Sequence, residues 1–166
     1  SPRRRELLEQ IGISFEVRVS DKEEVYHSLI PEEIVKELAL SKAENVADDL
    51  REKQEQVKQI SFDKKNNVLL DTIVIGADTI VVSDGSILGK PKDEADAVRM
   101  IRSLQGRSHK VYTGVAILDY DDEGKRKSVV HAVETEVFVN PMSDEEIREY
   151  AATGEPLDKA GAYALI

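Results

Sequence analysis

The stretch DTIVIGADTIVVSDG, from Asp71 to Gly85, constrains the fold more than any other part of the sequence. Apolar residues at 73–75 and 80–82 are typical of one buried β-strand, yet Asp78 stands at its centre. Because burying an unpaired carboxylate is costly, we expect Asp78 to be paired, bound to a metal ion or placed in a cleft. Gly76 allows a close approach or a kink there. A plainer interpretation, in which Asp78 caps the strand or pairs with a core cation, stays open.

Helical and extended patterns alternate along the rest of the chain. Helices are expected at residues 1–12, 30–57, 93–106 and 143–154, and strands at residues 14–20, 68–82, 87–90, 108–120 and 128–140. The last two strands are expected to pair as a long hairpin. With no internal repeat, low-complexity tract or linker, this order predicts a single α/β domain over residues 1–166 with a mixed β-sheet.

Local signals support two of these helices. Ser143 and Glu146 form the Ser-x-x-Glu pattern of a capping box at the start of the last helix. In the first helix, Leu7, Leu8 and Ile11 follow helical spacing, so we expect them on its inner face.

The charge of the chain limits its partners. It contains 33 acidic and 23 basic residues, for a formal net charge of −10. Such a chain is a poor candidate for duplex DNA or an anionic membrane, although a few converging cations can still hold a polyanion. Aromatic residues make up only 5%, without tryptophan, so stacking on single-stranded nucleic acid is also disfavoured.

Several absences from the sequence define the expected setting. There is no cysteine, which excludes disulfides and thiolate metal ligands. No apolar run approaches the roughly 18 residues of a membrane span, and no signal peptide is visible. We therefore expect a cytoplasmic protein with no membrane partner. The opening SPRRRELLEQ, without methionine, and the apolar closing AGAYALI predict that both ends are truncated.

Basic residues at three places could bind one anion. Arg3, Arg4 and Arg5 lie at an expected helix N-terminus, where backbone N–H groups favour anions and arginine adds bidentate phosphate contacts. Lys42 lies on the apolar face of its helix, and Lys90 projects from a glycine–proline bend. Each also has a plain structural interpretation: a solvated patch for the arginines, a snorkelling chain for Lys42 and an exposed loop for Lys90.

Other chemistry-bearing positions are less specific. His109 is one of only three histidines, so a hard divalent ion held by carboxylates and phosphate oxygens is easier to build than a histidine-rich zinc site. Asp158 and Lys159 precede the small residues 160–162, which favour either a backbone approach to a ligand or a tight turn. Neither a P-loop nor a serine-hydrolase motif is present.

Six ordered segments, SPRR, LALSKA, IGADTIV, LGKP, LQGRSHKVYTGV and DKAGAY, make the chain resemble the Maf family of nucleoside triphosphate pyrophosphatases. The matches extend from residue 1 to about residue 163, and six motifs in order are far more specific than one. The resemblance implies an elongated α/β fold like that of inosine triphosphate pyrophosphatases, with two lobes around a cleft. It also implies hydrolysis of a nucleoside triphosphate to the monophosphate and pyrophosphate, a divalent metal (Mg²⁺ or Mn²⁺), and a homodimer.

The same resemblance assigns roles to particular residues. Asp78 falls on the proposed catalytic acidic residue of the family, which we also expect to bind the metal. The substrate-binding positions of the family fall on Arg3, Arg4, Lys42, Thr79 and Lys90.

Base preference is implied by the resemblance at three positions. GRSH and DKAGAY look like the subgroup acting on dTTP and UTP rather than the one preferring methylated guanosine triphosphate. Thr79 and Arg3 occupy positions linked to base selection. A further selectivity position is normally a glutamine shortly after AGAY, where Ile166 stands here.

The mechanism expected from this set centres on Asp78, which would hold the metal, accept a proton from the water attacking the α-phosphorus, or do both. The cations would neutralise the triphosphate and the leaving pyrophosphate. The alternative is a nucleotide-binding regulator of cell division or septum formation with little or no hydrolysis. Pyrophosphate release from a panel of nucleotides separates the two functions.

Overall fold

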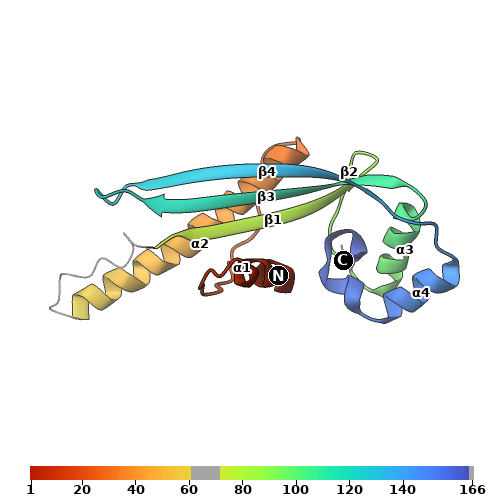
Figure 1. The fold of residues 1–166 in the computed structure, drawn as a ribbon, viewed down its shortest axis with the longest axis horizontal. Helices are drawn as coiled ribbons and strands as arrows, with labels where there is room; N and C mark the ends of the chain where they lie inside the picture. The colour runs from red at the N-terminus through yellow and green to blue at the C-terminus, as the bar shows by residue number, and fades with distance from the viewer. Residues whose placement is uncertain (61–71, 165–166) are drawn as a thin grey trace.

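The computed structural model describes residues 1–60 and 72–164 (Figure 1). Its elements are, in order, α1 (Pro2–Gln10), α2 (Pro31–Ile60), β1 (Val74–Ser83), β2 (Ser86–Leu88), α3 (Glu94–Leu104), β3 (Ser108–Tyr120), β4 (Arg126–Phe138), α4 (Asp144–Ala152) and the 3₁₀ turns η2 (Glu155–Asp158) and η3 (Ala160–Ala162). The expected strand residues 68–71 and the selectivity position Ile166 lie outside the described residues.

The described strands form one sheet in the order β2-β1-β3-β4. β3 and β4 make the expected hairpin, paired from Ser108 with Phe138 to Tyr120 with Arg126. β1 and β2 are joined by the two-residue turn Asp84–Gly85, whose φ angles of 50° and 75° suit a type I′ turn. Figure 1 shows the long sheet extending along the molecule, with α3 and α4 gathered near one end.

The expected α/β class, with helices flanking a sheet, is confirmed, but the strand directions differ from the expected mixed sheet. Every pairing between the four described strands is antiparallel. Parallel pairing within the described ranges is confined to one isolated bridge between Gln105 and Val139. Two of the three pairings have a local cause, because short turns join β1 to β2 and β3 to β4, and such turns connect antiparallel neighbours. β1 and β3 are joined through β2 and α3, so their antiparallel pairing follows from no single turn. The single domain, the two lobes and the cleft stay predictions.

α2 covers one face of the sheet because small residues let it approach closely. Its Ala39, Ala43 and Ala47 are buried against Ala116 and Leu118 of β3. β1 and β3 each carry a glycine directly beneath α2: an added Cβ at Gly76 would overlap the carbonyl oxygen of Ala39, and one at Gly114 would overlap that of Val35. The helix therefore rests on the strand backbone without intervening side chains.

A second apolar cluster lies at the end of the molecule where α3 and α4 gather. It is formed by Ala97, Met100, Ile101, Ile147, Ala151 and Ala162. The capping box at the start of α4 is confirmed, since Ser143 accepts from the backbone N–H of Glu146 and the Glu146 carboxylate accepts from that of Ser143. At this end of the molecule η3 lies beside β1, whereas η2 packs against α4.

The N-terminal thirty residues depart most from expectation. The alternating pattern at 14–20 forms no strand, because none of the described strands pairs with it, and its Val17 and Val19 are 51% and 75% exposed. The expected inner face of α1 is wrong for Leu7 and Ile11, which are exposed, whereas Leu8 is half-buried. No residue of α1 is fully buried. Within the described residues, no helix combines the length and apolar character needed to cross a membrane.

The contact between α2 and the sheet generates a stability prediction. Gly76→Ala should lower the free energy of unfolding by about 3 kcal/mol, because the new methyl group meets a helix backbone that cannot turn aside. Gly89→Ala is the matched control, since its Cβ would enter open space. Urea unfolding of both variants checks the prediction, and equal stabilities would contradict it.

Candidate active site

The carboxylate in the centre of β1 is paired with a lysine of α2. Lys42 Nζ lies 2.5 Å from Asp78 Oδ1 and 2.8 Å from Glu24 Oε1. The Asp78 side chain is only 14% exposed, whereas that of Glu24 is 59% exposed. One ammonium group therefore holds together two carboxylates from segments far apart in the sequence.

The strand and helix geometry explains this pairing. Alternate strand residues face the same side, so Asp78 shares the α2 face of β1 with Gly76. Because Gly76 brings the helix close, Lys42 needs no long reach to meet the carboxylate. Burial favours the neutral amine of Lys42, but hydrogen bonds to Asp78 and Glu24 outweigh it and raise the pKa of Lys42 above its usual 10.5. The lysine is therefore a fixed positive charge at neutral pH.

Arg4 reaches the same part of β1 from another direction. Its guanidinium donates to the Ala77 carbonyl oxygen at 2.8 Å and to Thr79 Oγ1 at 3.0 Å. Thr79 in turn shares a 2.9 Å hydrogen bond with Thr113, its partner on β3. Arg4 thus contacts the residues on both sides of Asp78.

This contact is possible because β1 has an open edge. β2 pairs only with Val81–Ser83, and none of the described strands pairs with that edge of β1 from Val74 to Ile80. Thr79 faces away from α2, whereas Asp78 faces toward it. The candidate site therefore lies around the edge of β1, with Lys42 on one side and Arg4 on the other.

Two predicted substrate-binding residues lie apart from these contacts. Arg3 is exposed and pairs with Glu6 of its own helix at 3.2 Å. Lys90 is exposed after β2, and the contacts of the described residues do not join it to Asp78. The hydrogen bond from Lys159, with a smaller attraction from Lys90, lowers the pKa of Asp158. Because the backbone N–H of Gly161 donates to the carbonyl oxygen of Gly89, Lys90 is a neighbour of the turn at 160–162, and its role in the site stays a prediction.

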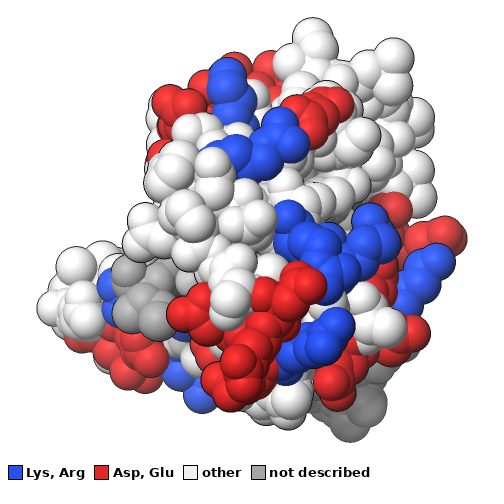
Figure 2. All heavy atoms as spheres, turned by 90° about the vertical axis from the view of Figure 1, so that its right-hand side faces the viewer, with Lys and Arg blue, Asp and Glu red and all other residues white. Residues whose placement is uncertain are grey.

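The end of the molecule that carries α3 and α4 does not form a continuous basic field. Figure 2 shows basic and acidic side chains lying beside one another there. Ion pairs account for part of this pattern, with Arg102 2.9 Å from Asp144 and Arg107 2.6 Å from Asp84. An anion would therefore find fewer free cations at this end than the number of basic residues suggests.

Glu24 is a candidate functional residue that the sequence analysis missed. It belongs to the stretch Asp21–Glu24, which carries three carboxylates and one lysine directly after the segment 14–20. The signal was this group of carboxylates, but sequence spacing alone could not show which of them would meet Lys42. Only the contact between distant segments identifies it.

The donor set fits a hard divalent cation in part. Carboxylate oxygens of Asp78 and Glu24 converge on one point, and such oxygens suit Mg²⁺ or Mn²⁺. No group of three or more potential metal-ligating side chains occurs among residues 1–60 and 72–164. A metal here would therefore need additional oxygens from water or from a bound phosphate chain.

A buried histidine–tyrosine pair lies at the start of β3. His109 is 4% exposed, and its Nε2 is hydrogen-bonded to the Tyr163 hydroxyl. Burial lowers the pKa of His109 below its usual 6.5 and raises the pKa of Tyr163 to about 12. Both groups are therefore uncharged at neutral pH, and neither contacts the Lys42 cluster.

Paired carboxylates, a fixed ammonium group and a guanidinium around one strand edge are features of a site for a metal and a phosphate chain. A family model described as Maf-like protein matches residues 1–165. The dTTP/UTP pyrophosphatase of Agathobacter rectalis is 42% identical over 165 residues, covering 99% of this chain and 78% of the relative. That of Dictyoglomus turgidum is 44% identical over 167 residues, covering 99% and 75%. The chain belongs to the Maf-like family, as its six ordered motifs predicted.

The raised pKa of Tyr163 generates a prediction about alkaline stability. The neutral phenol is favoured in the folded protein, so its contribution is fully present below the ordinary pKa of 10.0 and is lost as pH rises toward about 12. Between these values the stability of the wild-type chain should fall more steeply than that of Tyr163→Phe. Urea unfolding of both proteins across this window measures the two slopes, and parallel slopes would contradict the assignment.

Proposed function

We propose that this protein hydrolyses a nucleoside triphosphate to the nucleoside monophosphate and pyrophosphate, with dTTP and UTP as the favoured substrates. The observation that carries the proposal is the Lys42–Asp78–Glu24 cluster beside Arg4, in a chain of the Maf-like family. The names of the relatives, dTTP/UTP pyrophosphatases, support the choice of substrate.

Asp78 is the proposed general base. Its carboxylate accepts a proton from a water whose oxygen bonds to the α-phosphorus, while the bond from that phosphorus to the bridging oxygen of the leaving pyrophosphate breaks. Lys42 already touches Asp78, so a small rotation of its flexible chain can carry the ammonium group to a phosphate oxygen and free the carboxylate. Arg4 neutralises the phosphate chain from the other side of the strand edge.

The same cluster is the proposed metal site. Asp78 and Glu24 would hold Mg²⁺ or Mn²⁺, with phosphate oxygens completing the coordination. The ion, when bound, supplies positive charge against the phosphate chain. Arg3 and Lys90 are proposed to bind the triphosphate, and Arg3 and Thr79 to contribute to base selection.

The first test combines a nucleotide panel with one substitution. The wild-type chain should release pyrophosphate over many turnovers from dTTP or UTP with added Mg²⁺ or Mn²⁺, and less readily from CTP, ATP and GTP. Asp78→Asn should lower kcat by on the order of 10²-fold or more, because the amide cannot accept the proton. The matched control is Asp48→Asn, which removes the carboxylate of another ion pair between α2 and the sheet.

Full turnover by Asp78→Asn would remove the proposed role of this residue. Saturable nucleotide binding by the wild-type chain without pyrophosphate release would instead favour the alternative, a nucleotide-binding regulator of cell division. Thermal unfolding of both variants shows whether they are folded, so that a loss of catalytic activity can be told from a loss of structure.

A homodimer is also proposed, formed by the sheet face opposite α2. Ile75, Ile117 and Val129 are direct neighbours across three strands on this face, and Val129 is 70% exposed. No charged side chain lies within this row, although Asp119 and Lys127 are paired next to it on the same face, so two copies can pack the row together without burying a charge. The occupant we propose is therefore a second copy of the same chain.

Val129→Lys should weaken this dimer by about tenfold or more in Kd, because each interface would then bury two ammonium groups. Leu29→Lys is the matched control, since Leu29 is 93% exposed outside this face. Light scattering over a concentration series measures both variants and the wild-type chain. A wild-type chain that stays monomeric at every concentration would contradict the proposed interface.

A further inference from the structure

The pair formed by His109 and Tyr163 joins the sheet to the last described residues of the chain. The rings meet edge to face, with centroids 5.3 Å apart and planes inclined at 83°. His109 Nδ1 is buried without a hydrogen-bond partner. An unsatisfied buried nitrogen costs free energy that an apolar pair of similar shape would avoid, so packing alone does not account for this pair.

The segment before Tyr163 is a strained turn held against β1. Gly161 and Ala162 have φ angles of 72° and 63°, and a left-handed conformation is unfavourable for alanine. An added Cβ at Gly161 would lie 3.0 Å from both methyl groups of Val81, so the turn touches β1 directly. Strain of this kind persists only where the surroundings hold it in place.

One hydrogen bond connects this turn to the loop that carries Lys90. The backbone N–H of Gly161 donates to the carbonyl oxygen of Gly89 at 3.0 Å. Lys90 is the next residue along the chain. The position of its backbone therefore depends on the turn, and the turn depends on the anchor at Tyr163.

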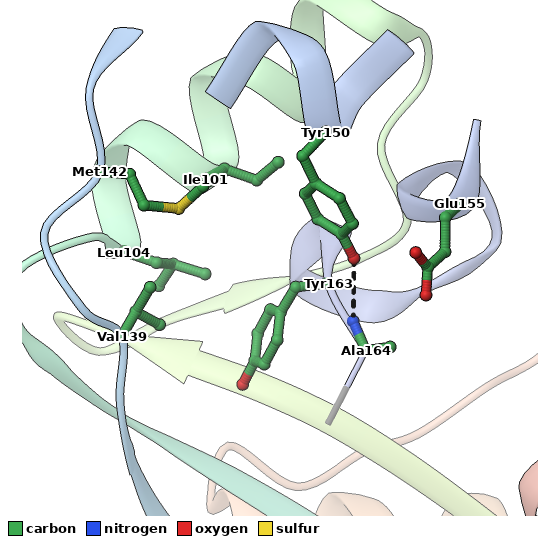
Figure 3. A pocket seen from close by; sticks show the side chains of 8 residues that line it. All are labelled: Ile101, Leu104, Val139, Met142, Tyr150, Glu155, Tyr163 and Ala164. Carbon is green, nitrogen blue, oxygen red and sulfur yellow. Dashed lines mark hydrogen bonds between the residues drawn. The ribbon is translucent and has the colours of Figure 1, made fainter. Parts of the chain in front are cut away.

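A second tyrosine secures the chain on the other side of this anchor. The backbone N–H of Ala164 donates to the Tyr150 hydroxyl at 3.3 Å, as Figure 3 shows. Both tyrosines line an open apolar pocket of about 270 Å³, whose other walls include residues of α3, of η2 and of the segment between β4 and α4. Because this pocket leaves one side of Tyr163 without packing, the hydrogen bond to His109 must supply the orientation that packing does not.

We propose that the His109–Tyr163 hydrogen bond positions Lys90 for the triphosphate by holding the 160–162 turn against Gly89. This inference rests on the proposed function, in which Lys90 binds the phosphate chain. His109 and Tyr163 are positioning residues here, since neither contacts the Lys42 cluster. The structure assigns them to Lys90 through named contacts: His109 to Tyr163, Gly161 to Gly89, and Gly89 to Lys90.

Three variants test the pair by kinetics. Tyr163→Phe removes only the hydroxyl, His109→Leu removes the ring nitrogens, and His109→Gln restores a group that can hydrogen-bond to the tyrosine. The first two should raise KM for dTTP or UTP by about tenfold with kcat changed much less, and the double variant should be no worse than either single one. His109→Gln should recover most of the lost affinity. Tyr120→Phe is the control, because it loses a hydroxyl bonded to Arg126 at the far end of the hairpin.

Amide hydrogen exchange at Gly161 gives a readout that does not depend on activity. Loss of the pair should speed this exchange by about tenfold relative to Tyr120→Phe, since the Gly161–Gly89 bond would open more often. A wild-type chain that releases no pyrophosphate contradicts the proposed function, while faster exchange in the variants still supports the link to Gly89. Unchanged exchange, or a lower thermal midpoint with unchanged KM, overturns the inference.

Discussion

The contact between the α2 backbone and two strand glycines determines the rest of this structure. Gly76 and Gly114 leave no side chain between helix and sheet, so the helix lies against β1 and β3 at a fixed height and register. That register brings Lys42 to Asp78. A larger residue at either glycine would push the helix away from the strand. It would therefore break the Lys42–Asp78 ion pair although both charged side chains were still present. The ion pair of this site therefore depends on the close packing of α2 against the sheet.

The sequence predicted the local features well, because their causes are local. The capping box of α4, the β3–β4 hairpin and a cation partner for Asp78 each follow from residues close in sequence or from the cost of burying a charge. The segment 14–20 was wrongly predicted as a strand because alternation shows only that a segment has two unlike faces, whereas pairing with another strand depends on how distant segments fold together. Glu24 was missed because its contact with Lys42 depends on how distant segments fold together.

The residues of the candidate site come from parts of the protein that are packed to different extents. Lys42 and Asp78 are held by the closely packed α2–sheet contact, whereas Arg4 belongs to a helix with no buried residue. Lys90 follows Gly89, whose carbonyl oxygen accepts a hydrogen bond from Gly161 in the 160–162 turn. Such an arrangement combines a rigid carboxylate with cations that can adjust to a phosphate chain, which suits a ligand of several linked charged groups.

The open edge of β1 has a consequence for the ligand-free protein. Unpaired strand edges invite pairing with other chains, and Arg4 blocks part of this edge by binding the Ala77 carbonyl oxygen. The N–H group engaged there cannot at the same time point at a phosphate. If an anion drew Arg4 away from Ala77, this stretch of the edge would be uncovered, so the Arg4–Ala77 hydrogen bond reduces the length of edge that is open to another chain.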